Sequence, residues 1–128
     1  MIDVNILVIE DEVELNNAYK RILETAHSNV KSAYNGAEAL EILANDGDPH
    51  IILLDLRMPI MNGIDFLKEY NAPAHPDTTI ILFSNYEAQD EVDQAYELGA
   101  QHYILKAMAS PKELLHNIET ILKQKSKE

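Results

Sequence analysis

The sequence predicts an α/β fold in which one doubly wound, five-stranded parallel sheet is built from five βα units. Short apolar runs alternate with segments of helical spacing about every ten to fifteen residues, a pattern typical of strands joined by crossover helices. Three of the apolar runs end abruptly in charged residues, and the carboxyl ends of parallel strands are where such sheets carry their chemistry. With 128 residues, 46% of them hydrophobic, the chain fits a single domain with one core.

The first two βα units occupy the amino-terminal part of the chain. A strand is expected at 6–9, and a shorter one at 30–33. Asn35-Gly36 is expected to turn the chain into the second helix, which ends near 45–49. Helical spacing predicts these inward side chains for the first helix: Leu15, Tyr19, Ile22, Leu23 and Ala26. For the second helix they are Ala37, Leu40, Leu43 and Ala44.

The other three units follow the same plan, with strands expected at 51–54, 79–83 and 102–105. Pro73 and Pro76 mark the exit from the third helix, because proline cannot continue it. The third helix is expected to bury Ile64, Phe66 and Leu67, and the fourth Val92, Ala95, Tyr96 and Gly99. The last helix starts at Pro111 and buries Leu114, Leu115, Ile118, Ile121 and Leu122.

The composition excludes several classes of site. The chain has no cysteine, which rules out disulfides, thiolate zinc sites and cysteine nucleophiles and fits a cytoplasmic location. No apolar run approaches the roughly 20 residues that cross a bilayer. Twenty-two acidic against ten basic residues give a formal charge of −12, which repels nucleic acids and anionic membranes. We therefore expect neither as a direct partner.

Polar residues follow four of the predicted strands. Glu10 and Asp11 follow the first, Asp55 the third, Ser84 the fourth and Lys106 the fifth. Because right-handed crossovers place all the carboxyl ends on one edge of the sheet, we expect these side chains to converge there. Three clustered carboxylates repel one another unless a cation is present, and an all-oxygen set suits Mg²⁺.

Four segments together resemble the receiver domain of response regulators, the phosphorylated proteins of two-component signalling: Ile9–Glu12, Asp55–Gly63, Phe83-Ser84 and Gly99–Lys106. The resemblance covers essentially the whole chain, so residues 1–128 are expected to form a single receiver domain. Its core spans about 4–124, and 125–128 form a tail or a truncated linker. The resemblance implies the flavodoxin-like strand order 2-1-3-4-5 and a relation to chemotaxis regulators. It leaves open a stand-alone regulator, a relay intermediate or a fragment of a longer protein.

The resemblance also implies roles for the polar residues. Asp55 would accept a phosphoryl group from a histidine kinase or a histidine phosphotransfer protein. Asp11 and Asp55 would ligate Mg²⁺ directly and Glu10 through water, with the main-chain carbonyl of Arg57 completing the shell. Lys106 would pair with the phosphoryl group. Such a protein is a phosphoacceptor switch rather than an enzyme, with at most slow autophosphatase activity.

Output in the family comes from a shift between two conformations. Ser84 matches the hydroxyl residue that moves toward the phosphoryl group, and Tyr103 matches the aromatic residue that turns inward. The surface that changes is the fourth helix, the fifth strand and the fifth helix. The resemblance leaves the downstream partner unnamed, and a dimer linked to phosphorylation is one form the output could take.

Three residues depart from the family pattern. Asn85 replaces the small residue common after the hydroxyl position, and its amide could narrow access to the phosphorylated aspartate. Ala107 stands where a proline, often with a cis peptide bond, usually follows the lysine. A cis bond before a residue other than proline costs roughly 2.5–4 kcal/mol, so we expect this loop to be either trans and rearranged or strained. Arg57 places a large cation two residues after Asp55, where it could meet the phosphoryl group or obstruct the attacking water. Arg57 therefore predicts slow self-dephosphorylation.

Three other functions compete with the receiver interpretation. A pseudo-receiver would bind partners through the same surface without phosphoryl chemistry, but none of the acids, the aspartate or the lysine is lost here. A flavodoxin-type cofactor site needs a phosphate-cradling loop after the first strand, whereas Glu10-Asp11-Glu12 would repel phosphate. An aspartyl phosphatase would want a second acid where Arg57 stands.

Overall fold

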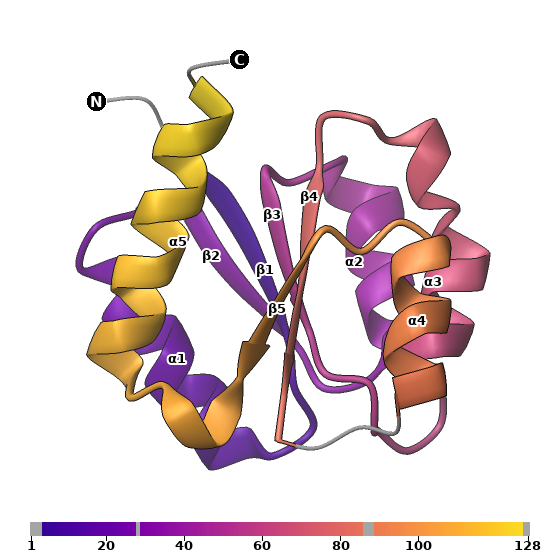
Figure 1. Cartoon of the computed structure of the whole chain (residues 1–128), viewed down its shortest axis with the longest axis horizontal. Helices are drawn as coiled ribbons and strands as arrows, with labels where there is room; N and C mark the ends of the chain where they lie inside the picture. The colour runs from indigo at the N-terminus through magenta and orange to yellow at the C-terminus, as the bar shows by residue number, and fades with distance from the viewer. Residues whose placement is uncertain (1–3, 28, 86–88, 127–128) are drawn as a thin grey trace.

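The computed structural model describes residues 4–27, 29–85 and 89–126, and it confirms the predicted fold class. Five parallel strands form one sheet in the order β2-β1-β3-β4-β5 (Figure 1). The strands are β1 (Asn5–Ile9), β2 (Asn29–Ala33), β3 (Ile51–Leu54), β4 (Thr79–Ser84) and β5 (His102–Leu105). The α-helices of the described residues are α1 (Val13–Glu24), α2 (Gly36–Asp46), α3 (Gly63–Tyr70), α4 (Gln89–Glu97) and α5 (Pro111–Ser126). Short 3₁₀ turns lie at Ala72–Ala74 and Lys106–Met108.

Helices cover both faces of the sheet, with α1 and α5 on one face and α2, α3 and α4 on the other (Figure 1). Successive side chains of a strand point to opposite faces, so each central strand contributes to two cores. On β1, Leu7 and Ile9 belong to the cluster beneath α2, α3 and α4, while Ile6 and Val8 belong to the cluster beneath α1 and α5. Burial on both faces explains why the central strands are continuous apolar runs rather than alternating ones.

Helix starts are fixed by short polar side chains. The side-chain oxygens of Asn35 and Asn62 accept hydrogen bonds, each 2.9 Å long, from the main-chain N–H groups of Glu38 and Asp65. Each asparagine is therefore the N-cap of its helix, and the glycine that follows is the first helical residue. Asn35-Gly36, which was expected to turn the chain into a helix, thus sets where α2 begins, and the second Asn-Gly pair sets where α3 begins.

Some predicted inward positions were wrong. Ala37 and Ala44 are exposed, and Ala39 is the fully buried alanine of α2. Tyr96 is 42% exposed, and Gly99 lies beyond the end of α4 at a φ of +118°. The alanines misled because a methyl group gains little from burial, so an alanine can lie on either face of a helix at small cost. Ala26 likewise lies beyond the end of α1.

Helix α5 continues to Ser126, two residues past the expected end of the core. The ammonium group of Lys125 donates to the carbonyl of Asp77 at 2.6 Å and to the hydroxyl of Thr79 at 3.0 Å. These contacts tie the carboxyl-terminal end of α5 to the amino end of β4. Residues 127–128 of the expected tail lie outside the described residues. Within the described ranges, no helix has both the length and the apolarity that crossing a membrane would require.

Gly63 places the first turn of α3 directly against the end of β3. A Cβ atom at Gly63 would lie 2.6 Å from the main-chain oxygen of Asp55 and 2.8 Å from the Cα of Leu56. We expect Gly63→Ala to lower the free energy of unfolding by about 1–3 kcal/mol, the usual cost of overpacking a core. Urea denaturation followed by circular dichroism measures the loss.

Gly47→Ala is the control for this prediction. Gly47 has a φ of +82° and open space around it, so its substitution meets only the cost of a left-handed backbone, about 1–2 kcal/mol. We expect Gly63→Ala, unlike Gly47→Ala, also to shift the amide resonances of Asp55 and Leu56. Unperturbed resonances at these two residues would contradict the proposed contact.

Candidate functional site

The register of the sheet brings the acidic residues together. Strands β1 and β3 are neighbours, and Ile9 pairs with Leu54. The residues that follow, Glu10 and Asp55, therefore leave the sheet side by side. The main-chain N–H of Asp55 donates to the carbonyl of Ile9 at 3.2 Å, which extends the pairing to the first residue after the strand.

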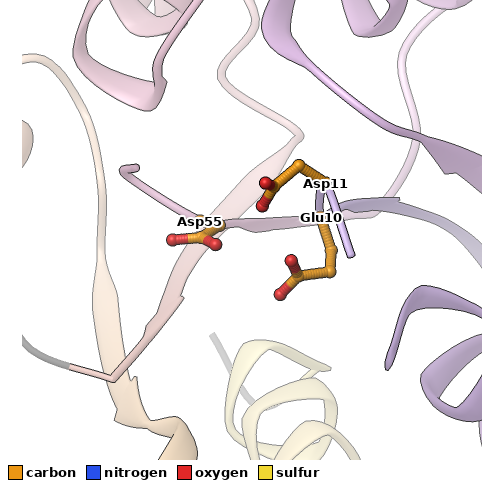
Figure 2. A group of neighbouring side chains, drawn as sticks. All are labelled: Glu10, Asp11 and Asp55. Atoms are coloured by element: carbon orange, nitrogen blue, oxygen red, sulfur yellow. The ribbon is translucent and has the colours of Figure 1, made fainter. Parts of the chain in front are cut away.

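Glu10, Asp11 and Asp55 converge at this edge (Figure 2). One carboxylate oxygen from each lies within 4.8 Å of the others. Glu10 is 3% exposed and Asp55 8%, while Asp11 is half-buried. The expected meeting of the three acids is therefore found, and two of the three carboxylates are almost out of contact with water.

Lys106 supplies a positive charge inside the cluster. Its ammonium group donates to a carboxylate oxygen of Glu10 and, at 3.1 Å, to Oδ2 of Asp55. The Lys106 side chain is only 8% exposed. Cis peptide bonds are absent from the described residues, so the Lys106-Ala107 bond is trans, and the chain continues as a 3₁₀ turn over Lys106–Met108. Of the two alternatives for this loop, the structure has the trans, rearranged one.

Two further donors hold the other oxygen of Asp55. The hydroxyl of Ser84 and the main-chain N–H of Arg57 each donate to Oδ1 at 3.2 Å. Ser84 reaches it because β4 runs one residue further than expected, and Ser84 is the last residue of that strand. Asp55 thus has donors on both oxygens: Ser84 and Arg57 on Oδ1, and Lys106 on Oδ2.

The electrostatics of the cluster follow from its burial. Burial raises the pKa of Glu10, and the hydrogen bonds from Lys106 and from the N–H of Glu12 only partly offset that rise. Burial lowers the pKa of Lys106, but the carboxylates of Glu10 and Asp55 outweigh it and leave the pKa raised. The ammonium group therefore stays charged, while the buried carboxyl resists ionisation.

These residues fit a hard divalent cation. The cluster offers only carboxylate oxygens, which are ligands that Mg²⁺ prefers, and it contains no sulfur or imidazole donor. Burial is the main cause of the raised pKa of Glu10, and the nearby charge of Asp55 adds to it, so a bound cation would favour the ionised carboxylates.

The guanidinium group of Arg57 reaches across to α4. Its Nη2 forms an ion pair at 3.3 Å with Glu91 on α4, and the Arg57 side chain is 61% exposed. The pair spans from the loop after β3 to the first turn of α4. The main-chain N–H of Arg57 contacts Asp55, and the expected effect of its side chain on the phosphoryl group or on attacking water stays a prediction.

Tyr103 lies apart from the cluster. It is half-buried and packs against the core beneath α2, α3 and α4. Tyr103 also lines a groove of about 470 Å³ along β5 and α5, together with Tyr96 of α4, Met108 of the 3₁₀ turn and Ile121 of α5. The surface of α4, β5 and α5 that is predicted to change thus contains a groove, and Tyr103 lies between this groove and the core.

Sequence reasoning missed Asn16. This residue of α1 is fully buried, and its amide group donates to three main-chain carbonyl oxygens near the carboxyl ends of β1 and β2. The available signal was its spacing, because Asn16 recurs with Tyr19 and Leu23 on the buried stripe of the helix. A polar residue on that stripe needs buried partners.

Comparison with protein families matches residues 6–119 to the model of the response regulator receiver domain. The transcriptional regulatory protein CpxR of Klebsiella pneumoniae is 36% identical over 119 residues, which cover 93% of this chain and 49% of CpxR. The chemotaxis protein CheY of Halobacterium salinarum is 31% identical over 109 residues, covering 83% of this chain and 87% of CheY. The chain therefore spans about half the length of the transcriptional regulator and most of the chemotaxis protein.

A solved structure supports the fold. The CheY-like receiver domain protein of Methanospirillum hungatei superposes with a TM-score of 0.87 over 98% of each chain, at 24% sequence identity. The strand order 2-1-3-4-5 expected from the resemblance agrees with the observed sheet.

The raised pKa of Glu10 predicts a pH dependence. The pKa of this carboxyl is higher in the folded than in the unfolded chain, so the protonated carboxyl stabilises the fold at pH values below its ordinary pKa of 4.5. That stabilisation is lost as the pH rises through the pKa of the folded state. Without divalent cations, we therefore expect Glu10→Gln to gain stability relative to the unchanged protein as the pH rises from 4.5. Urea denaturation across pH 4.5–8 measures both proteins. Parallel stability curves would contradict the burial argument.

Proposed function

Since this chain belongs to the response regulator receiver domain family of two-component signalling, we propose that it is a switch phosphorylated on Asp55 with the help of Mg²⁺. A histidine kinase or a histidine phosphotransfer protein is the proposed donor. The observation that carries the proposal is the convergence of Glu10, Asp11 and Asp55, with the ammonium group of Lys106 paired to the two buried carboxylates, those of Glu10 and Asp55. A surface cluster of acids would need neither the burial nor the lysine.

The proposed reaction moves one phosphoryl group. An oxygen of the Asp55 carboxylate forms a bond to phosphorus as the bond from phosphorus to the donor breaks, and the donor leaves with that electron pair. A cation held by Asp11 and Asp55 directly, by Glu10 through water and by the Arg57 carbonyl would neutralise charge on the incoming group, which an isolated carboxylate repels. The product is an acyl phosphate on Asp55.

The chain's own donors are placed for the product. Lys106 and Ser84 already donate to the two oxygens of Asp55, at 3.1 and 3.2 Å. After transfer, we propose that the ammonium group pairs with a phosphoryl oxygen and that the Ser84 hydroxyl donates to another. Both groups already contact Asp55, the proposed nucleophile, so neither has to move far to reach a phosphoryl group attached to it.

We propose that output passes through the surface of α4, β5 and α5. Ser84 ends β4, whose neighbour in the sheet is β5, and Ser84 pairs with Leu105 two residues after Tyr103. A movement of Ser84 toward the phosphoryl group would therefore displace β5, the strand that carries Tyr103. Phosphorylation shifts such an equilibrium only by interacting differently with its two states, and the new Ser84 contact is one such difference.

The direct test is the intact mass of the protein after incubation with acetyl phosphate, with and without Mg²⁺. We expect the gain of one phosphoryl group only with Mg²⁺ and none in Asp55→Asn, which lacks the attacking carboxylate. No gain in folded protein that binds Mg²⁺ and is offered a kinase would contradict the proposal. That result would favour a protein-interaction module that phosphorylation does not control.

Arg57 provides a second test, on the lifetime of the phosphoryl group. Arg57 has a large side chain at the rim of the site, so we expect it to obstruct attacking water and Arg57→Asn to shorten the lifetime severalfold. Phosphate release from purified phosphoprotein measures it. Glu91→Gln is the matched control, because it removes the ion pair but keeps the guanidinium group, and its lifetime should not shorten. An unchanged or longer lifetime in Arg57→Asn would refute the obstruction.

A further inference from the structure

A buried amide on α1 is placed to orient the acidic site. Asn16 is fully buried, and its Nδ2 donates to the carbonyl oxygens of Glu10 at 3.0 Å, Ala33 at 3.1 Å and Val8 at 3.4 Å. Its Oδ1 accepts a hydrogen bond from the hydroxyl of Ser32. One side chain therefore joins α1 to the carboxyl ends of both β1 and β2.

The contact with Glu10 has a particular consequence. The carbonyl of Glu10 belongs to the peptide group that links Glu10 to Asp11, so Asn16 fixes the orientation of that peptide. The N–H of Glu10 is also held, because it donates to the carbonyl of Ala33 at 3.0 Å. With both peptide groups that flank Glu10 held, the direction in which its side chain leaves the main chain is set from outside the site, and one of the two peptide groups that flank Asp11 is held as well.

A simple helix–strand packing role would not need this chemistry. An apolar side chain of the same size would fill the space, but the Glu10 and Ala33 carbonyls would lose the donor that Asn16 provides. Asn16 itself is satisfied at both ends, since no described buried side-chain nitrogen or oxygen lacks a partner. Buried polar groups with complete hydrogen bonding fix one geometry, because any displacement leaves several of them unpaired.

We infer that Asn16 is a positioning residue of the metal and phosphorylation site, holding the peptide between Glu10 and Asp11 so that both carboxylates face Asp55. The inference rests on the proposed function, because it concerns the same acidic cluster. Asn16 acts through the main chain and touches neither the cation nor the phosphoryl group. Residues that orient ligands from behind commonly change metal affinity about 10- to 100-fold when they are removed.

The test is the affinity for Mg²⁺, measured by isothermal titration calorimetry on the unphosphorylated protein. We expect Asn16→Ala to weaken binding about tenfold, because the Glu10-Asp11 peptide loses its donor. Asn16→Ser retains a hydroxyl donor that is too short to reach all three carbonyls, and we expect a smaller loss of about threefold, on the scale of one weakened hydrogen bond. The serine variant carries the test if the alanine variant does not fold.

Two control variants distinguish the positioning of the Glu10-Asp11 peptide by Asn16 from a general loosening of the packing around α1. Ser32→Ala removes the hydrogen bond that Asn16 Oδ1 accepts but leaves the Glu10 contact, and Ile118→Val loosens the core beneath α1 and α5 away from the site. Both should bind Mg²⁺ within about twofold of the unchanged protein, since neither touches the Glu10-Asp11 peptide. Equal weakening in the controls and in Asn16→Ala would overturn the inference.

The outcomes also distinguish the inference from the proposed function. If the unchanged protein does not bind Mg²⁺, the proposed metal site is wrong and the inference falls with it. If the unchanged protein binds Mg²⁺ and both Asn16 variants bind it equally well, only the inference is overturned. Correlated changes in Mg²⁺ affinity and in the amide resonances of Glu10 and Asp11 would support it.

Discussion

The structure depends on one buried charge arrangement, in which the ammonium group of Lys106 lies between the carboxylates of Glu10 and Asp55. All three side chains are nearly inaccessible to water, and taking charges out of water is costly unless they are paired. The pairing works only because β1, β3 and β5 end at the same edge of the sheet. The parallel topology is therefore a condition of the site, and the unequal count of two acids to one base leaves room for a further cation.

Most of the fold was predictable because its signals are local. Strands β3 and β5 were predicted with the observed boundaries, since an apolar run that stops at a charged residue leaves little choice of end point. The meeting of Glu10, Asp55 and Lys106 was also predictable, because it follows from parallel strands and crossover handedness alone. The helix faces were less predictable at Ala37, Ala44 and Tyr96, because burying an alanine methyl group gains little free energy and tyrosine is only intermediate in burial.

Interactions between segments that are distant in the chain could not be predicted from the sequence. Asn16 contacts main-chain carbonyls at the ends of two strands. Every residue has such a carbonyl, so the residue types do not reveal which ones Asn16 contacts. The partner of Arg57 was likewise unpredictable, because Glu91 lies on another element and many other acids compete for one guanidinium group. The sequence permits two alternatives for the Lys106-Ala107 loop, because the energetic cost of a cis bond does not indicate which other path the chain takes. Topology was thus accessible, while hydrogen-bond partners were not.

The Arg57–Glu91 ion pair has a consequence for how this sequence can vary. Helix α4 begins with Gln89, Asp90 and Glu91 and carries no basic residue in its last turn, so Arg57 provides compensating charge from another loop. If position 57 became neutral, the negative charge of Glu91 would lose this ion pair beside an already negative site, and a neutral residue at position 91 would then be favoured. Among descendants of this sequence, the two positions should therefore change together, although α3 and β4 lie between them in the sequence.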